Sequence, residues 1–521
     1  MPRELARALA QGLKEADVHK IFGMPGGGPN LDMIGCAQEL GIDFVLTHGE
    51  TAACIMAASY GRLTGTTGVA VVTRGPGLTS AANGLAQATL DRFPLLLISD
   101  TVSYANADRT AHQRLDQVAV AAPLTKYSGT LGTADPAKVV VAAARLALTG
   151  PAGAVHLTFD PTVPGDPAPS LPAYSLRDEA TVEQARRLLA TARRPVIIVG
   201  LDGARYGADV RAALASFSCP VLVTYQAKGA VPESWSTYAG LFTGAAIERP
   251  LLDHSDLILG IGLDPVEPMP GPWPYAAPTV LVHSHPTETS YFGASLAVVG
   301  AYSELLPLLL KLSHPEWESA AGQTIRRRNQ KLLIAPSEGL SPHDVVRTTQ
   351  QLLKDAAVTV DAGAHMLVVM PLWETDEPDS VLISNGLATM GFALPAAIAT
   401  ALARPGRRVV CFVGDGGLAM VLGELETLVR LQLDVTVVVF NDASLTLIQL
   451  KQGDGQGGPA AVRYGPVDFS RIGTATGVES SVANDLPSLR TALAPRHDGP
   501  RLVDARIDPS TYPHVIRLTR G

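Results

Sequence analysis

The sequence predicts an α/β protein of three doubly wound domains, each built on a parallel sheet. Short apolar runs alternate with helix-like segments along the whole chain, as expected of parallel strands that are buried on both faces. The 521 residues are 46% hydrophobic, enough for several buried cores. A proline-rich stretch at 163–177 and a less distinct break at 314–342 divide this alternation into three blocks.

The blocks predict an N-terminal domain at 1–165, a central domain at 178–325 and a C-terminal domain at 340–521. The first block opens with an amphipathic helix rather than a signal peptide, and its strands are expected at IFGMPG, DFVLTH, GVAVVT, FPLLLISD and AVHLTF. The second block has strand-like runs at RRPVIIVG, CPVLVTY, LILGIG and PTVLVHS. The third has them at AVTVDAG, VLISNG, RRVVCFVGDGG and VTVVVFND. An old duplication would explain the similar patterns, although no clear internal repeat is visible.

Charge and composition exclude several classes of function. The net charge is −8 with acids and bases well mixed, so there is no basic footprint for nucleic acid. No apolar stretch reaches the length of a membrane span. The four cysteines are scattered singly and are expected to be buried thiols in a reducing cytoplasm rather than a disulfide framework or a zinc site; they are Cys36, Cys54, Cys219 and Cys411.

A possible metal site follows two neighbouring strands of the third block. Asp415 comes directly after the strand RRVVCFV, and Asn441-Asp442 follows the next strand. In a βαβ unit both strand ends lie at the carboxyl edge of the sheet, where α/β sheets bind ligands. Carboxylate and amide oxygens near a phosphate suit Mg²⁺. Three glycines around the aspartate would let a ligand approach the backbone, at Gly414, Gly416 and Gly417. A tight turn with Asp415 as helix N-cap is the alternative.

This stretch resembles the thiamine diphosphate fingerprint, in which GDG is followed by an Asn after the next strand. Over nearly its full length, the chain is similar to the acetolactate synthase-like family of thiamine diphosphate enzymes. The resemblance implies that Asp415, Asp442 and the backbone carbonyl of Ser444 hold Mg²⁺, with Asp442 in place of the family's usual second Asn. Asn441 is a rival ligand if the register shifts by one residue.

Two further stretches of the third block match the family's cofactor contacts. ISNGLATMGFALPAA (383–397) implies that Met390 holds the cofactor bent and that the carbonyl of Ala388 faces its aminopyrimidine. From the residues alone, Met390 could equally pack in a core. DAGAHM (361–366) resembles the loop that holds the diphosphate, here through the backbone of Ala364 and His365.

The first block carries a candidate catalytic carboxylate. Glu50 lies where a strand runs into a helix in DFVLTHGETAACIMAASYGRLTG (43–65), and an isolated acid there is ordinarily a helix-start carboxylate favoured by the helix dipole. The stretch resembles the family's His-Glu segment, which implies that Glu50 hydrogen-bonds N1′ of the aminopyrimidine and shares a proton with it. In this family the site lies between the first domain of one subunit and the third domain of another, which implies a dimer or a tetramer.

Two more stretches imply contacts on the substrate side. TRGPGLTSAANGLAQATLDRFPLLLISD (73–100) matches the family's GPG stretch and implies that Pro76 lies near the cofactor. TAHQRLDQVAVAAPLTKYS (110–128) resembles its FQE region, which implies that Gln113 points into the site. Without the resemblance, Gln113 could equally be a helix-surface residue. His112 replaces an aromatic residue, and either a proton shuttle or a neutral neighbour would fit there.

Departures from the family pattern bear on flavin and on the substrate. Lys451 stands where biosynthetic acetolactate synthases have a Trp that selects 2-oxobutyrate. LDPVEPMPGPWPY (263–275) lacks the Arg of the flavin-contacting stretch, and FAD is therefore expected to be absent or weak. His283 and His285 would point to opposite faces of a strand, which disfavours zinc. Three central glycines are too loosely spaced for a dinucleotide fingerprint, at Gly200, Gly203 and Gly207.

The resemblance implies an enzyme that decarboxylates a 2-oxo acid with thiamine diphosphate and Mg²⁺ and passes the acyl unit to a second carbonyl. A non-ligating 2-oxo acid decarboxylase or aldehyde lyase is the alternative within this class. An inactive, cofactor-binding regulatory paralogue is a rival from another class, against which the retained Glu50 argues. A flavin-dependent oxidase is a third hypothesis, which a yellow protein would support.

Overall fold

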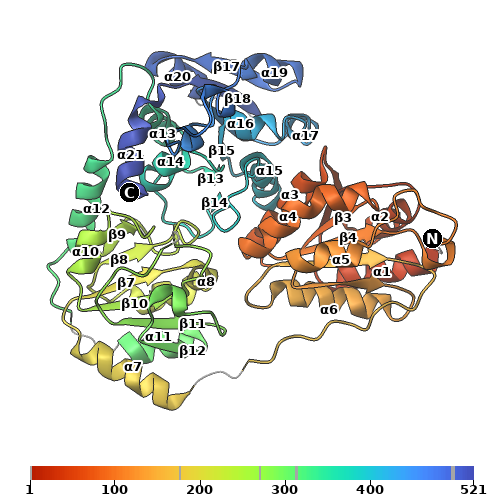
Figure 1. Cartoon of the computed structure of the whole chain (residues 1–521), viewed down its shortest axis with the longest axis horizontal. Helices are drawn as coiled ribbons and strands as arrows, with labels where there is room; N and C mark the ends of the chain where they lie inside the picture. The colour runs from red at the N-terminus through yellow and green to blue at the C-terminus, as the bar shows by residue number, and fades with distance from the viewer. Residues whose placement is uncertain are drawn as a thin grey trace.

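The computed structural model describes residues 3–174, 178–268, 271–310, 315–453, 455–494 and 499–520. The chain forms three six-stranded sheets with helices packed around them. In Figure 1 the N-terminal domain lies on the right, the central domain at the lower left and the C-terminal domain above it. All strand pairs within these sheets are parallel. The predicted fold class is confirmed.

The N-terminal sheet has the strand order β2-β1-β3-β4-β6-β5. Its strands are β1 Lys20–Met24, β2 Asp43–Leu46, β3 Gly68–Val72, β4 Leu95–Asp100, β5 Tyr127–Leu131 and β6 Ala154–Phe159. Its helices are α1 Arg3–Glu15, α2 Pro29–Glu39, α3 Glu50–Thr64, α4 Pro76–Leu90, α5 Gln117–Ala121 and α6 Pro136–Leu148. The strands β3, β4 and β6 are buried throughout, because they run between two helical layers.

The central sheet has the order β12-β11-β10-β7-β8-β9, which is the strand order of dinucleotide-binding domains. Its strands are β7 Pro195–Val199, β8 Val221–Val223, β9 Tyr238–Leu241, β10 Leu257–Ile261, β11 Thr279–His283 and β12 Leu296–Val299. Its helices are α7 Glu179–Thr191, α8 Leu201–Arg205, α9 Gly207–Leu214, α10 Arg249–Asp253 and α11 Tyr302–Leu310. The strand order reverses between β7 and β10, the position where such sheets bind ligands.

The C-terminal sheet has the order β14-β13-β15-β16-β18-β17, which repeats the order of the N-terminal sheet strand for strand. Its strands are β13 Ala357–Val360, β14 Val381–Ile383, β15 Val409–Gly414, β16 Val435–Asn441, β17 Glu479–Ala483 and β18 Arg501–Arg506. The helices from the preceding linker onward are α12 Ala321–Leu332, α13 Pro342–Leu352, α14 Met366–Leu372, α15 Ala393–Ala403, α16 Asp415–Ala419, α17 Glu424–Arg430, α18 Thr446–Gln449, α19 Phe469–Ala475, α20 Leu486–Leu493 and α21 Tyr512–Thr519. The shared order fits a duplication.

The N-terminal and C-terminal domains share one apolar core, in which α3 packs against α15. Both helices are rich in alanine, so their backbones approach closely. Phe93 and Phe392 meet edge to face with ring centroids 6.3 Å apart. Beside them the carboxylate of Asp91 accepts hydrogen bonds from the Ser384 hydroxyl and the Gly386 N–H, both at 2.6 Å. These contacts fix one domain on the other.

The linkers are also partly visible. Residues 163–174 contain no helix or strand and lead toward the central domain, while 175–177 lie outside the described residues, as does residue 314 of the second break. In the second break, α12 returns the chain along the central domain (Figure 1). Among the helices of the described ranges, none has the length and apolar character needed to cross a membrane.

The helical part of the predicted βαβ unit is divided in two. The structure has two short helices, α16 and α17, and the turn between them is closed by i→i−3 bonds from Met420 N–H to Gly417 O and from Val421 N–H to Leu418 O. The break brings Gly423 against the N-terminal domain, where a Cβ at Gly423 would lie 2.7 Å from Cβ of His48. A glycine at this break lets the two domains approach closely.

Candidate active site

A cavity of about 330 Å³ opens at the carboxyl edge of the C-terminal sheet. Strands β15 and β16 run side by side up to the pair Gly414 and Phe440, so the turns that follow them are neighbours. All the residues predicted in this domain line the cavity except Asn441; they are Ala364, His365, Ala388, Met390, Gly414, Asp415, Gly416, Gly417, Asp442 and Ser444. The expected convergence of separate sequence stretches is therefore seen in the structure.

Two carboxylates meet in this cavity. Oδ2 of Asp415 accepts the N–H of Asp442 at 3.2 Å and the N–H of Ala443 at 2.7 Å. Its Oδ1 accepts the N–H of Gly416 at 2.7 Å and the hydroxyl of Tyr464 at 2.5 Å. The carboxylate of Asp442 accepts a hydrogen bond from the Thr446 hydroxyl. Tyr464 was not predicted, because it lies 49 positions from its partner and outside any motif.

The electrostatics of this pair favour a cation. Burial raises the pKa of Asp415, and burial together with the neighbouring charge of Asp415 raises the pKa of Asp442 to about 6. Among the described residues, no group of three or more His, Cys, Asp or Glu could hold a metal ion. A hard cation here would therefore take other oxygens, such as backbone carbonyls or phosphate, beside the two carboxylates.

Asn441 faces away from the cavity. Its side-chain amide donates to the carbonyl of Val467 at 2.9 Å and to Oδ1 of Asp504 at 2.8 Å. Asp504 lies on β18, on the far side of β16 from β15. The side chain of Asn441 therefore joins two parts of the domain, and Asp442 is the member of the pair that lines the cavity.

His365 leaves an unpartnered polar atom beside the cavity. Its ring stacks on Phe440 with centroids 5.2 Å apart, and burial lowers its pKa to about 3, so the ring is neutral. Within the described part of the chain, Nε2 has no hydrogen-bond partner. A Cβ at Gly414 would lie 3.3 Å from Cε1 of this ring, and one at Gly416 would lie 3.0 Å from the Tyr464 hydroxyl. Glycine at both positions keeps the cavity open to a polar ligand.

The segment of Ala388 and Met390 is held by a buried acid that was not predicted. Asp361, at the end of β13, accepts the N–H groups of Gly391 at 3.0 Å, Phe392 at 2.7 Å and Ala393 at 3.1 Å. Burial raises its pKa to about 6. Ala388 has a φ of 55°, in the left-handed region. An acid at the end of a predicted strand was the available signal for Asp361.

The predicted residues of the N-terminal domain also gather at a carboxyl edge, that of their own sheet. Glu50 begins α3 after β2, Pro76 begins α4 after β3, and His112 and Gln113 lie in the loop after β4. Gln113 has a φ of 57° and covers Gly75, where a Cβ would lie 2.9 Å from the Gln113 carbonyl oxygen. Of the described residues in one chain, those lining the cavity include none of these four.

In the central domain, a buried carboxylate occupies the position where sheets of this strand order bind ligands. At the reversal between β7 and β10, Oε2 of Glu267 accepts the N–H groups of Leu201 at 2.9 Å and Asp264 at 3.1 Å, and its other oxygen accepts the Thr224 hydroxyl. Burial raises the pKa of Glu267 to about 8. Nearby, Asp202 accepts from the hydroxyl of Tyr302 at 2.6 Å.

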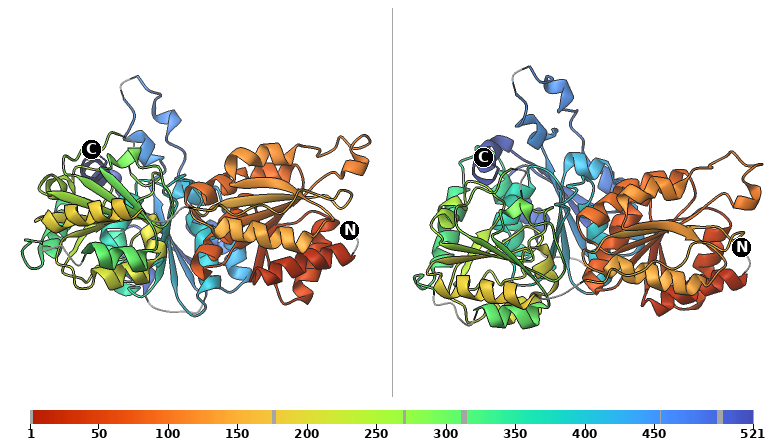
Figure 2. Two further views of the ribbon diagram at one scale, coloured as in Figure 1. Left: turned by 90° about the horizontal axis from the view of Figure 1, so that it is seen from below. Right: turned by 60° about the horizontal axis from the view of Figure 1, so that its bottom comes forward.

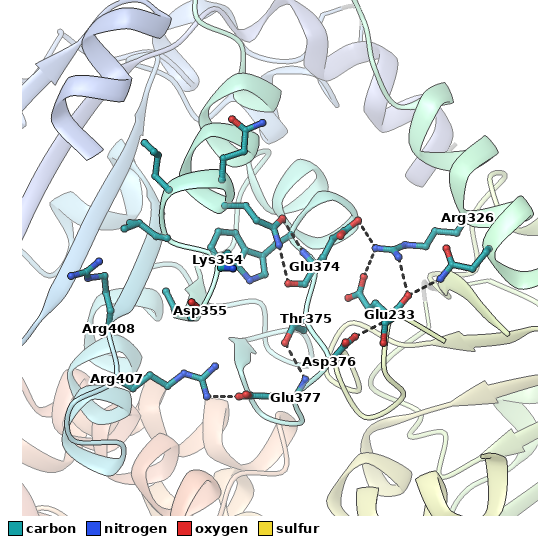
Figure 3. Close-up of a pocket in the computed structure, with 18 of the residues that line it drawn as sticks. Glu233, Arg326, Lys354, Asp355, Glu374, Thr375, Asp376, Glu377, Arg407 and Arg408 are labelled. Atoms are coloured by element: carbon teal, nitrogen blue, oxygen red, sulfur yellow. Dashed lines mark hydrogen bonds and ion pairs between the residues drawn. The ribbon is translucent and has the colours of Figure 1, made fainter. Parts of the chain in front are cut away.

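A larger hollow of about 1330 Å³ lies between the central and C-terminal domains. Figure 3 shows it crossed by ion pairs, including Arg326 with Glu374 at 2.7 Å and Arg326 with Glu233 at 2.8 Å. It lies where β13 and β15 begin, the amino edge of the C-terminal sheet, opposite the edge where parallel sheets bind ligands. We therefore place the candidate site in the smaller cavity.

Comparison with known proteins identifies the family of all three domains. Three family models match the chain: the N-terminal TPP binding domain of thiamine pyrophosphate enzymes at residues 3–120, their central domain at 182–309, and their C-terminal TPP binding domain at 361–505. The chain is 29% identical to the acetolactate synthase of Bacillus subtilis (strain 168), over 96% of this chain and 93% of that protein. It is 30% identical to an acetolactate synthase large subunit of Lactococcus lactis subsp. lactis (strain IL1403), over 86% and 82%. A catabolic acetolactate synthase of Raoultella terrigena is also 30% identical, over 96% and 95%.

Proposed function

The chain belongs to the acetolactate synthase-like family of thiamine pyrophosphate enzymes, and from this premise we propose that it decarboxylates a 2-oxo acid and joins the acyl unit to a second carbonyl. The observation that carries the proposal is the pair Asp415 and Asp442 at one cavity, with the unpartnered Nε2 of His365 beside it. Thiamine diphosphate is the cofactor, and Mg²⁺ is proposed as its counter-ion.

Each side of the cavity has a part in holding this cofactor. Asp415, Asp442 and the carbonyl of Ser444 would bind Mg²⁺, because two partly buried carboxylates favour a divalent cation. The backbone of Ala364 and His365, with Gly414, Gly416 and Gly417, would surround the diphosphate. Met390 would support the bent cofactor, and the carbonyl of Ala388 would accept from its aminopyrimidine. When bound, thiamine diphosphate supplies the electron sink for decarboxylation.

The residues of the N-terminal domain are proposed to complete the site of a second subunit. Glu50 would exchange a proton with N1′ of the aminopyrimidine, while Pro76 and Gln113 would cover the substrate and His112 would lie at the entrance. Both carboxyl edges expose large apolar side chains on a single chain, which two subunits related by a twofold axis would bury against each other. The exposed side chains are Met24 at 42%, Leu31 at 55% and Leu46 at 46% on one edge, and Met420 at 63% and Ile448 at 51% on the other. We therefore propose a dimer, or a tetramer of such dimers.

We propose that the central domain binds no FAD, although its strand order is that of a dinucleotide-binding domain. The carboxylate of Glu267 takes the N–H groups of Leu201 and Asp264, which a ligand phosphate would need. Flavin released from purified protein by acid and measured by its absorbance tests this. A stoichiometric amount of FAD would overturn the proposal and reopen the oxidase hypothesis.

The proposal extends to boundaries and location. We propose domains at 1–165, 178–325 and 340–521, because residues 163–174 form no helix or strand. All four cysteines are free and buried, as predicted, and this supports a cytoplasmic location.

A product assay separates the activities within this class. Purified protein with thiamine diphosphate and Mg²⁺ is given 2-oxo acids, and CO₂, aldehyde and ligated product are measured. Condensation predicts ligated product. CO₂ with aldehyde and no ligated product would favour a non-ligating decarboxylase or aldehyde lyase, the second candidate. Cofactor binding without turnover of any 2-oxo acid would favour the inactive paralogue.

A further inference from the structure

A cationic side chain lines the candidate cavity and has no part in the chemistry described above. Lys451 follows α18, on a segment that projects from the C-terminal domain (Figure 2), and its side chain is exposed. Within the described ranges its ammonium group has no hydrogen bond or ion pair, whereas the polar side chains around it are engaged. Gln449 accepts from the Ser444 hydroxyl at 2.8 Å, and Gln452 donates to the Gln456 carbonyl at 3.1 Å.

Lys451 lines the same cavity as the two carboxylates, and a short segment of chain joins it to Thr446. The helix α18 starts at Thr446, whose hydroxyl donates to Asp442. Lys451 follows Thr446 by five positions and lies two residues beyond the end of α18. Leu447 and Ile448 line the cavity between them. The cavity therefore offers a ligand two carboxylates, apolar side chains and one ammonium group.

We propose that Lys451 binds an anionic group at the far end of the substrate, distinct from the carboxylate that leaves as CO₂. This inference rests on the proposed function and names its substrate class: a 2-oxo acid, as donor or acceptor, that carries a second carboxylate, a sulfonate or a phosphonate. An anionic end gains a charge-assisted hydrogen bond from the ammonium group that an alkyl end cannot form, which favours dianionic over neutral substrates.

The second cation of the cavity does not take this role. Arg520 lines the same cavity but has a partner within the described part of the chain. The remaining ionisable groups at the cavity are the two carboxylates, His365, which is neutral because burial lowers its pKa to about 3, and Tyr512, which is neutral because burial raises its pKa. Lys451 is thus the cation available to a substrate.

The test compares the holoenzyme with Lys451→Met and Lys451→Arg, and with Lys354→Met as the matched control, an exposed lysine at the other hollow (Figure 3). The probes are pyruvate and 2-oxobutyrate as neutral-ended acids, and 2-oxoglutarate, sulfopyruvate and phosphonopyruvate as dianionic ones. Each acid is assayed alone as donor and beside pyruvate as acceptor. Thermal unfolding of every variant shows whether it is folded.

We expect the wild-type enzyme to prefer at least one dianionic acid. Lys451→Met should lower kcat/KM for that acid by about 10- to 100-fold, the value of one charge-assisted hydrogen bond, and change pyruvate by less than about threefold. Lys451→Arg should retain most of the preference, and Lys354→Met should equal wild type. Equal losses for neutral and dianionic acids, or a wild-type preference for neutral ones, would overturn the inference while leaving the proposed function intact.

Two binding measurements keep the inference separate from the proposed function. If no acid is turned over, the proposed function fails, and calorimetry with the dianionic acids tests the role of Lys451 separately. Binding of a dianionic acid that Lys451→Met weakens by about tenfold supports the inference. Unchanged binding in the variant, or no binding to the wild type, rejects it. Thiamine diphosphate affinity is measured in the same variants. If Lys451→Met weakens the cofactor and leaves substrate preference unchanged, the lysine belongs to the diphosphate and the inference is wrong.

Discussion

The backbone N–H of Asp442 donates to Oδ2 of Asp415 over 3.2 Å, so the turn after β16 is built on the side chain that follows β15. Both oxygens of Asp415 accept backbone N–H groups, so the NH₂ group of Asp415→Asn would face another donor. Asp442→Asn still offers Mg²⁺ one side-chain oxygen. We expect Asp415→Asn to weaken Mg²⁺-dependent cofactor binding by about 100-fold or more, and Asp442→Asn by less than about tenfold. Calorimetric titration of the apo protein measures both. Equal losses would mean that the two acids are equivalent ligands.

The separation of Glu50 from the cavity makes the shared site testable. Glu50→Gln should lower turnover by at least about 100-fold and leave thiamine diphosphate affinity within a few-fold, because the side chain acts on a proton rather than on the diphosphate. Asp415→Asn should also be inactive. In mixed dimers of the two variants, one site combines an intact Glu50 with an intact Asp415.

Activity of that mixture decides between sites within and between subunits. Half of randomly paired dimers are mixed and each holds one intact site of two, so about a quarter of wild-type activity should return. The control is each variant mixed with itself. If the mixture stays inactive although exchange of differently tagged subunits is demonstrated, Glu50 and Asp415 do not serve one site in the way proposed.

Ala388 is a left-handed residue at a position where glycine would be unstrained. Its φ of 55° costs an alanine about 1 kcal/mol or more. A glycine removes this strain, but part of the gain is lost because glycine makes the unfolded chain more flexible. We expect Ala388→Gly to raise the free energy of unfolding by about 0.5 to 1 kcal/mol. Ala397→Gly, within α15, is the matched control and should lower it by about 1 kcal/mol or more. A loss of stability in Ala388→Gly, measured by urea unfolding, would contradict the strain argument.

Sequence patterns predicted the buried strands well and the edges poorly. The strands β5, β9, β12 and β17 were not predicted, and each is an edge strand of its sheet. An edge strand is covered less completely, so it needs no continuous apolar run; β5, for example, reads YSGTL with three of its five positions only half-buried. The strand β18 was missed for another reason. It lies inside the sheet but carries Asp504, which is paired with Asn441.

The candidate site was predictable where the chemistry is local to a motif. The GDG turn, the Ala388 to Met390 segment and the 361–366 loop converge because each follows a strand at the same edge. Tyr464 and Asp361 could not be assigned from the sequence, because their roles depend on contacts with residues far along the chain. The choice between Asn441 and Asp442 likewise required the structure, since the register of a turn decides which side chain faces inward.

Glu267 should make stability depend on pH. Its pKa is about 8 in the folded protein, against an ordinary value of 4.5. Between these values the unfolded chain loses the proton while the folded protein keeps it, so stability falls as pH rises, by up to about 1.4 kcal/mol per pH unit. Glu267→Gln keeps an oxygen that accepts the Leu201 N–H but cannot ionise. Its melting temperature should therefore fall less than that of the wild type from pH 5 to pH 8. Parallel curves would show that Glu267 is ionised when folded.

The ion pairs in Figure 3 should hold the central domain to the C-terminal domain. Arg326 of α12 contacts Glu233, which is 3% exposed and also pairs with the buried Lys228, and it contacts Glu374 beyond α14. Arg326→Met leaves the buried Oε2 of Glu233 without its donor, so it should cost about 3 kcal/mol. Glu374→Gln is the matched control at the same arginine. Its side chain is 54% exposed, and it should cost less than about 1 kcal/mol.

The way in which the lost stability divides between the domains shows whether Arg326 holds them together. Arg326→Met should unfold in two steps in urea, with hydrogen exchange in α12 and the β8 to β9 region rising before exchange in the C-terminal sheet. Glu374→Gln should keep one cooperative step. The reason is geometric: Arg326 contacts Glu374 and also donates to the backbone carbonyl of Glu233 at 3.0 Å, so its loss weakens both contacts, whereas Glu374→Gln leaves the bond to Glu233 intact. A single step with unchanged midpoint in Arg326→Met would show that the apolar contacts of these domains hold them together without the charges.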